Sequence, residues 1–99
     1  MEVKKVIKHI VMWKFKRDEK ENMKKFIKGL NNLKLIIPEI KYMETGININ
    51  PNNQYDAILI SEFETMEDLE KYKNHPEHIK VSSLCKEIRE DRQAIDYEF

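Results

Sequence analysis

The chain has 99 residues, which is enough for one domain with one hydrophobic core. Its 18 basic and 18 acidic side chains cancel, so the composition argues against a general polyanion-binding role and against a nucleic-acid partner. One cysteine excludes an intrachain disulfide. No apolar run approaches the roughly 20 residues that span a bilayer. The charged start does not resemble a signal segment, and we therefore expect a cytoplasmic protein without a membrane partner.

Charge is unevenly distributed along the chain. Residues 1–50 carry 12 basic and 6 acidic side chains, and residues 51–99 carry the reverse. One interpretation is an RNA-binding stripe in the first half. The other is a basic first helix lying beside an acidic second helix in the same domain. We prefer the second, because neither a glycine-rich loop nor interleaved aromatic and basic residues accompany the charge.

The first predicted element is a strand over residues 6–15, where β-branched and aromatic residues run without a breaker. At a period of two residues, His9, Val11 and Trp13 share one face. Ile10 and Met12 lie on the other face. Both faces are apolar in the middle of the strand, which is typical of a central strand covered on both sides.

A helix is predicted next, beginning at an Asp18–Glu21 capping box and ending before Pro38. Gly29 lies inside this helix at a cost of roughly 1 kcal/mol relative to alanine, and we interpret it as a point of close packing on the sheet. The apolar residues at helical spacing are Met23, Phe26, Ile27, Leu30 and Leu33.

Two strands, an interrupted helix and a last strand complete the predicted order. Residues 40–49 and 55–63 are predicted strands that flank a turn rich in asparagine. Thr65 begins a helix that Pro76 interrupts, because proline lacks an N–H and clashes with the preceding turn. The helical pattern resumes and ends near residue 88, and residues 92–97 alternate as a short final strand.

The element order βαββαβ predicts an α+β fold, a ferredoxin-like arrangement in a single domain over residues 1–99. Crossovers of one hand place both helices on one face of the antiparallel sheet. The other face would then expose several hundred Å2 of apolar surface, which is unusual for a monomer. We therefore predict a homodimer that packs sheet to sheet as a barrel. The predicted interface residues are Ile10, Met12, Met43, Ile58 and Ile60.

The segment Tyr72–His78 is the candidate site for chemistry, because it places a tyrosine and two histidines around Pro76. The bend can turn His78 beneath the fold, where an imidazole with a pKa of about 6.5 can exchange protons. We assign His75 to stabilising the bend. We predict no metal site, because Pro76 spoils helical spacing between the histidines. Cys85 is interpreted as a buried apolar residue.

Several short motifs occur together along nearly the whole chain. They are Lys8–Lys16 (KHIVMWKFK), Ile37–Ile40 (IPEI), Tyr55-Asp56, Ser61–Phe63, Tyr72–His78 and Asp96-Tyr97. In this order they resemble the stress-responsive A/B barrel (Dabb) family. The resemblance implies a ferredoxin-like subunit of a dimeric α+β barrel, in a family that includes many members without an assigned activity.

The best-understood enzymes of that family resemble a polyketide cyclase that uses no cofactor. By this resemblance, His78 would be the general base and Tyr72 would donate a hydrogen bond to a substrate carbonyl. Three positions depart from the cyclase pattern, because Ala57 replaces a pocket histidine, Leu30 replaces an aromatic hydroxyl, and Trp13 occupies substrate volume. The predicted ligand-pocket residues are His9, Val11, Trp13, Phe26, Ile27, Leu30, Ala57 and Leu59.

Three functions remain open at this point. The first is binding of a small hydrophobic or carbonyl-bearing molecule in a cavity between helices and sheet. The second is cofactor-free proton transfer on a carbonyl compound by His78 and Tyr72, with His9 as either a cavity group or a core histidine. The third is a purely structural role as a dimer subunit. Complete filling of the cavity by Trp13, Phe26 and Leu30 would favour the third.

Overall fold

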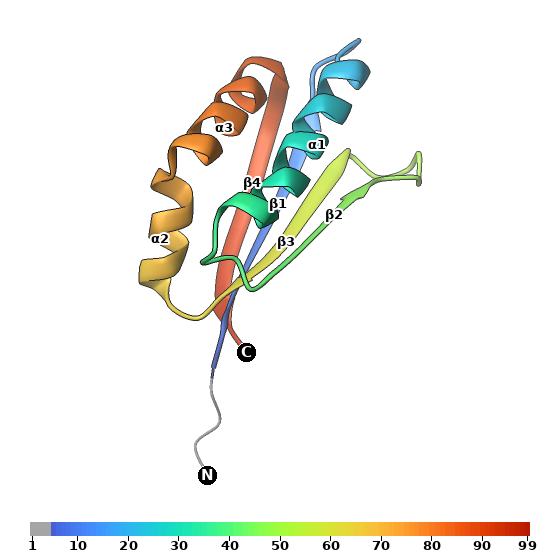
Figure 1. Cartoon of the computed structure of the whole chain (residues 1–99). Helices are drawn as coiled ribbons and strands as arrows, with labels where there is room; N and C mark the ends of the chain where they lie inside the picture. The colour runs from blue at the N-terminus through green and yellow to red at the C-terminus, as the bar shows by residue number, and fades with distance from the viewer. Residues whose placement is uncertain (1–4) are drawn as a thin grey trace.

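The computed structural model describes residues 5–99, and part of the charged start on which the signal-segment expectation rests lies outside this range. Figure 1 shows a four-stranded sheet with helices packed against it. The predicted ferredoxin-like order is confirmed, with the second helix divided in two. The elements are β1 (Ile7–Phe15), α1 (Lys20–Ile36), β2 (Tyr42–Ile47), β3 (Ala57–Phe63), α2 (Met66–Asn74), α3 (Pro76–Ile88) and β4 (Arg89–Glu98).

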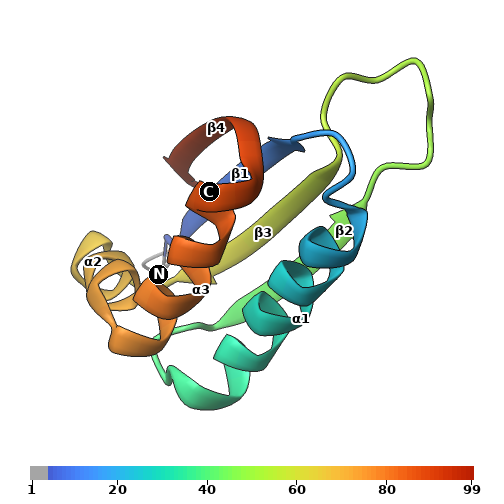
Figure 2. The same cartoon turned by 90° about the horizontal axis from the view of Figure 1, so that it is seen from above.

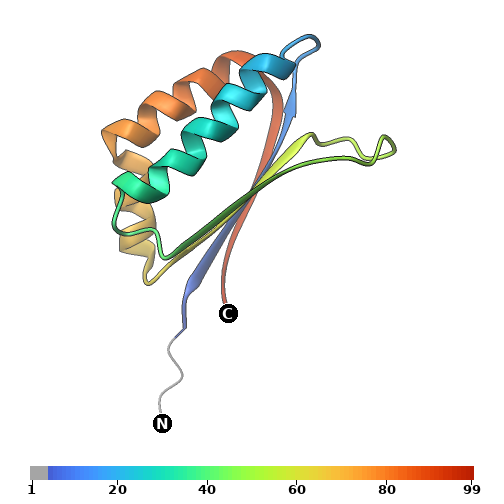
Figure 3. The ribbon, with the colours of Figure 1, turned by 45° about the vertical axis from the view of Figure 1, so that its right-hand side comes forward.

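The sheet has the strand order β2-β3-β1-β4, and all its neighbouring strands are antiparallel. The two strands with apolar residues on both faces, β1 and β3, are therefore central, as predicted. In the register, Ile10 lies opposite Ile60 on β3 and opposite Ile95 on β4. Figure 3 shows α1, α2 and α3 on one side of the sheet. Within residues 5–99 no helix covers the other side, which we call the bare face.

The hydrophobic core lies between the helices and one face of the sheet. Alternate residues of β1 and β3 are buried there, and five residues of α1 cover them. Trp13 and Phe26 meet edge to face with their ring centroids 4.9 Å apart, a geometry that favours aromatic pairs. Figure 2 shows α1 and α3 side by side above this layer, while the β2–β3 hairpin projects beyond the sheet.

The predicted capping box at the start of α1 is wrong. Asp18 has a φ of 65°, in the left-handed region, so the chain reverses there before the helix begins. The N-cap is Glu19, whose side chain makes no capping hydrogen bond. Its carboxylate instead accepts a hydrogen bond from Nδ2 of Asn22 at 3.0 Å. The tight turn out of β1 therefore overrides the local capping pattern.

The strand limits also differ from the predicted ones. β2 and β3 are shorter than predicted, because the asparagine-rich segment leaves the sheet as a projecting loop. β4 is longer, and it pairs with β1 from Ile7 opposite Glu98 to Phe15 opposite Arg89. Most of its residues are exposed, because β4 is an edge strand. Side-chain alternation therefore underestimated its length.

The break at Pro76 is confirmed together with the role of His75. The His75 Nδ1 atom accepts a hydrogen bond from the Glu77 N–H at 3.1 Å, and Pro76 is the first residue of α3. Thr65 begins α2 as predicted, because its Oγ1 accepts from the Asp68 N–H at 3.1 Å. Two side-chain caps therefore define the two helices that follow β3.

The bare face of the sheet carries Ile10, Met12, Ile58 and Ile60, as predicted, all at least partly exposed. The prediction for Met43 is wrong. Met43 pairs with Ser61 and therefore points to the helix side, where it packs against the core. Side chains of β2 therefore alternate between the two faces in the opposite sense to the predicted one. The bare face gains Ile95, Tyr97 and Tyr42, which are 61%, 41% and 40% exposed. Within residues 5–99, no helix is both long and apolar enough to cross a membrane.

Gly29 was predicted to pack closely on the sheet, and this prediction is wrong. Gly29 packs against α3, since a Cβ at this position would lie 3.2 Å from Cγ2 of Val81. We expect Gly29→Leu to lower the free energy of unfolding by about 1–3 kcal/mol through overpacking, despite leucine's better helix propensity. Urea unfolding measures this change. Lys28→Leu, on the exposed side of the same helix, serves as the control and should change stability by less than about 0.5 kcal/mol. Equal losses in both variants would contradict the close approach of the helices.

Candidate functional site

A cavity of about 40 Å3 lies between the sheet and the helices. Its volume is small beside the roughly 300–1,000 Å3 of common ligand pockets. Most residues predicted to line a pocket meet there, but Ile27 and Ala57 do not. Ile27 is buried elsewhere in the core, and Ala57 lines a separate hollow at the base of the β2–β3 hairpin. The lining residues are His9, Val11, Trp13, Phe26, Leu30, Leu59, Tyr72, His78, Ser82, Cys85, Arg89 and Arg92.

Tyr72 reaches the cavity from α2 and is fully buried. Its ring packs against Phe63 and His78, with centroid separations of 5.1 and 4.4 Å. Among residues 5–99, nothing forms a hydrogen bond with its hydroxyl. Burial raises the pKa of Tyr72 far above its ordinary value, so the phenol keeps its proton. It is therefore a neutral hydrogen-bond donor without an acceptor, an arrangement that costs stability unless a ligand supplies one.

The interruption of the helix at Pro76 positions His78. Its Nδ1 lies 3.0 Å from the carbonyl oxygen of Lys73. A carbonyl oxygen only accepts, so Nδ1 carries the proton and Nε2 keeps its lone pair. Burial lowers the pKa of His78 and is the largest influence on it, although the bond to the Lys73 carbonyl oxygen acts in the opposite direction. The nearby positive charges of Arg92 and Lys73 lower it further. The imidazole is therefore neutral near pH 7 and offers Nε2 as a base.

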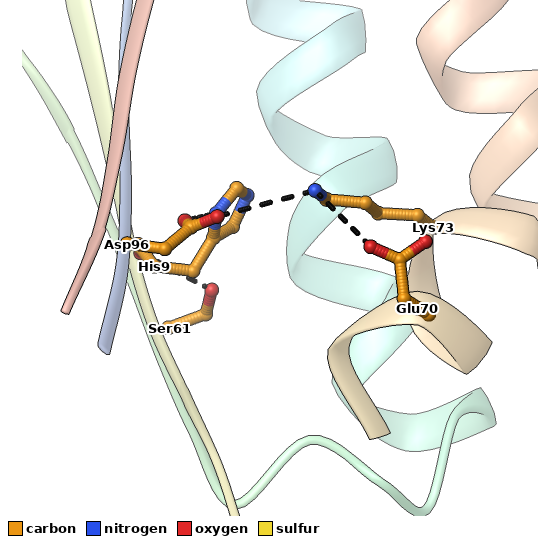
Figure 4. A network of polar contacts seen from close by, with 5 residues as sticks. All are labelled: His9, Ser61, Glu70, Lys73 and Asp96. Atoms are coloured by element: carbon orange, nitrogen blue, oxygen red, sulfur yellow. Dashed lines mark hydrogen bonds and ion pairs between the residues drawn. The ribbon is translucent and has the colours of Figure 1, made fainter. Parts of the chain in front are cut away.

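His9 lies in the middle of β1, in a polar network that extends to the surface (Figure 4). Its Nδ1 donates to Oδ1 of Asp96 on β4 at 2.5 Å. The other Asp96 oxygen lies 4.0 Å from Nζ of Lys73, which in turn lies 3.8 Å from the Glu70 carboxylate. Ser61 donates to the His9 carbonyl oxygen at 3.3 Å. The bond to Asp96 fixes the tautomer of His9, with the proton on Nδ1. Its Nε2 therefore keeps a lone pair.

Burial is the largest influence on the pKa of His9 and lowers it, although the bond to Asp96 acts in the opposite direction. The ring centroids of His9 and Tyr72 are 6.2 Å apart. His9, Tyr72 and His78 therefore form a continuous row of rings along the cavity, with one protonated phenol between two imidazoles. The phenol can donate a hydrogen bond to a carbonyl oxygen, and an imidazole beside it can accept a proton. Enolisation of a carbonyl compound requires both.

Within the described part of the chain, no three His, Cys, Asp or Glu side chains come close enough to hold a metal ion. Burial raises the pKa of the Cys85 thiol, so Cys85 is protonated at neutral pH and a weak nucleophile. The side chains that line the cavity can form hydrogen bonds and transfer protons.

Comparison with known proteins identifies the family. The family model for the stress-responsive A/B barrel domain matches residues 7–99. The chain belongs to this family. The resemblance seen in its motifs is thus confirmed over almost the full length.

Relatives of this A/B barrel domain include an olivetolic acid cyclase of Cannabis sativa. It is 30% identical over 95 residues, which cover 92% of the chain and 94% of the cyclase. A stress-response A/B barrel domain-containing protein of Arabidopsis thaliana is 26% identical over 98 residues, 93% of the chain, but the chain spans only 46% of that relative's length. A crystal structure from Bacteroides fragilis, described as a dimeric protein of unknown function with a ferredoxin-like fold, superposes with a TM-score of 0.90. It is 33% identical, and the match covers 95% of this chain and 96% of that one.

Sequence reasoning about this A/B barrel domain missed several cavity residues. Ser82, Arg89 and Arg92 were not predicted at the site, and Asp96 was noted only as part of a family motif. Ser82 lies on α3, and its place depends on how that helix packs on the sheet. For Arg92 and Asp96 the missing information was the pairing of β4 with β1. Once Trp13 is opposite Arg92 and His9 is opposite Asp96, the side of the sheet to which these residues point follows from strand alternation.

The lowered pKa of His78 predicts how stability depends on pH. In the unfolded chain His78 takes up a proton near pH 6.5, and in the folded chain it does so only at lower pH. Between the two pKa values the unfolded state binds more protons, so the free energy of unfolding falls as the pH is lowered through this window. We expect His78→Gln to reduce that fall between about pH 7 and about pH 5. Urea midpoints across this range measure it, and parallel curves for wild type and variant would contradict it.

Proposed function

We propose that this A/B barrel domain binds a small carbonyl compound in the helix–sheet cavity and transfers a proton on it without a cofactor. The observation that carries the proposal is the buried Tyr72 hydroxyl, which lines the cavity and has no acceptor within residues 5–99. A carbonyl oxygen is the acceptor that a protonated phenol matches. The relative named as a cyclase supports this class of chemistry.

The proposed roles follow from the protonation states. Tyr72 donates to the carbonyl oxygen and stabilises the negative charge that develops there as an adjacent C–H bond breaks. His78 accepts that proton at Nε2, because its Nδ1 proton is directed to the Lys73 carbonyl oxygen. Val11, Leu59 and the other apolar lining residues exclude water from the pair. His9 is the second imidazole beside Tyr72 and is oriented by Asp96.

Cavity volume limits the ligand. About 40 Å3 admits a carbonyl group with few further atoms and cannot enclose a long polyketide chain. Trp13, Phe26 and Leu30 line the cavity and limit its space, yet they do not fill it completely. The remaining space favours ligand binding over a purely structural role. We therefore propose a ligand of a few heavy atoms, or the carbonyl end of a larger one.

Deuterium exchange at the carbon next to a carbonyl, followed by proton NMR in D2O, tests the proposal on small ketones and oxoacids. Wild type should accelerate exchange, Tyr72→Phe should lose about 10²-fold and His78→Gln about 10²–10⁴-fold. Tyr55→Phe is the matched control, because Tyr55 does not line the cavity and its hydroxyl donates to Asp91. Binding without exchange would reduce the function to ligand binding. Exchange that survives both substitutions would remove the assigned roles.

We also propose that two copies of the chain pack through the bare face of the sheet. The face exposes Met12, Ile95 and Tyr97, and a hollow of about 410 Å3 opens on it beside Ile58. Monomeric proteins seldom expose an apolar surface of this extent. The Bacteroides fragilis protein with the same fold is described as dimeric, which supports the proposal.

Light scattering tests the dimer. Ile60→Glu and Met12→Glu each place a charge on the bare face, and we expect either change to give monomers or aggregates, because an unpaired buried carboxylate is costly. Leu35→Glu is the control, since Leu35 lies on α1 and is 88% exposed. A wild-type chain that is monomeric and well behaved would contradict the proposed interface.

A further inference from the structure

The cavity contains an unexpected concentration of positive charge. The chain has three arginines, Arg17, Arg89 and Arg92, and two of them line the same small space. Arg89 is half-buried at the junction of α3 and β4. Arg92 lies opposite buried Trp13, so it points to the helix side of β4, and its exposure places it at the rim.

Neither guanidinium has an anionic partner among residues 5–99. The ion pairs of this part of the chain involve lysines or His9, and none includes Arg89 or Arg92. The cavity lining contains no carboxylate. The acidic residues nearby have other partners. Asp96 accepts from His9 and lies beside Lys73, Asp91 accepts from the Tyr55 hydroxyl, and Glu90 pairs with Lys14. Arg89 lies near the thiol of Cys85, whose pKa it lowers slightly against the larger effect of burial.

The two arginines are held in place by backbone structure. α3 ends at Ile88, whose carbonyl oxygen accepts from the Lys16 N–H at 2.9 Å, and β4 begins at the next residue. Strand pairing with β1 then fixes Arg92 three residues further along. Arg89 is half-buried, and a partly desolvated cation without a counter-ion costs free energy, so an anion that binds there explains the arrangement best. Exposed Arg92 adds a second guanidinium donor at the rim.

We infer that the ligand is an oxoacid whose carboxylate is bound by Arg89 and Arg92 while its carbonyl oxygen accepts from Tyr72. This inference rests on the proposed function and names its substrate class. Guanidinium donors match the two oxygens of a carboxylate, and they bind it more strongly than they bind a neutral oxygen. The carboxylate lies at the rim beside exposed Arg92, so only the carbonyl end needs to enter the space of about 40 Å3.

Binding of acetoacetate, a small 3-oxoacid, tests the inference by calorimetry or NMR titration. Its methyl ester keeps the carbonyl and removes the charge. Acetate keeps the charge and removes the ketone, and inorganic phosphate reports general anion binding. We expect acetoacetate to bind at least about tenfold more tightly than each of the other three, because it alone offers both a carboxylate to the arginines and a ketone oxygen to Tyr72.

Arg89→Gln and Arg92→Gln should each weaken acetoacetate binding, by about tenfold or more for the half-buried Arg89. They should leave binding of the ester unchanged. Arg92→Lys, which keeps the charge, should restore part of the affinity lost in Arg92→Gln. Arg17→Gln is the matched control, because Arg17 is exposed and is not among the residues that line the cavity. Circular dichroism at the titration temperature confirms that each variant is folded.

The two proposals fail in different ways. Equal affinity for acetoacetate and its ester, with no effect of either glutamine variant, would overturn the inference that the ligand is an oxoacid. The proposed binding of a carbonyl compound would then be decided by Tyr72→Phe alone. Phosphate binding as tight as acetoacetate binding would also overturn it. Arginine-dependent acetoacetate binding that is unchanged in Tyr72→Phe would support the anion site and remove the proposed role of the phenol. No binding of any probe to folded wild type would overturn both.

Discussion

Proline at position 76 has no N–H, so α2 stops at Asn74 and a new helix starts at Pro76. Two consequences of this constraint reach the cavity. His75 caps α3 by accepting from the Glu77 N–H, which in a continuous helix would bond to the Lys73 carbonyl oxygen. That carbonyl oxygen is therefore free to accept from Nδ1 of His78. One missing hydrogen bond thus determines which nitrogen of the imidazole can act as a base.

The cavity combines groups that burial keeps uncharged with groups that remain charged. Burial lowers the pKa values of His9 and His78 and raises that of Tyr72, so proton donor and proton acceptor coexist at neutral pH. The two arginines add positive charge beside these groups. The charge of Arg92 disfavours protonation of both histidines and favours an anionic ligand. One electrostatic arrangement therefore serves both proposed properties of the site.

The two faces of the sheet differ in what covers them. The helix side supplies the core and the cavity, and its central positions are occupied by His9 and Ser61 where the row of apolar residues is interrupted. The bare side is apolar from β3 through β1 to Ile95 on β4. β1 and β3 contribute side chains to both faces. A dimer contact on the bare face would therefore be separated from the cavity on the helix side only by the sheet itself.

Local sequence was sufficient for the fold, because two-sided apolar strands, helical spacing in α1, the Thr65 cap and Pro76 each depend on neighbouring residues alone. The motifs also identified the family. Tertiary structure decided what depends on strand pairing. Register placed Met43 on the helix side. It also brought Asp96 to His9 and Arg92 opposite Trp13 at the cavity rim, although each pair is far apart in the sequence. The turn at Asp18 and the unpartnered Tyr72 hydroxyl likewise depend on packing, which no local pattern records.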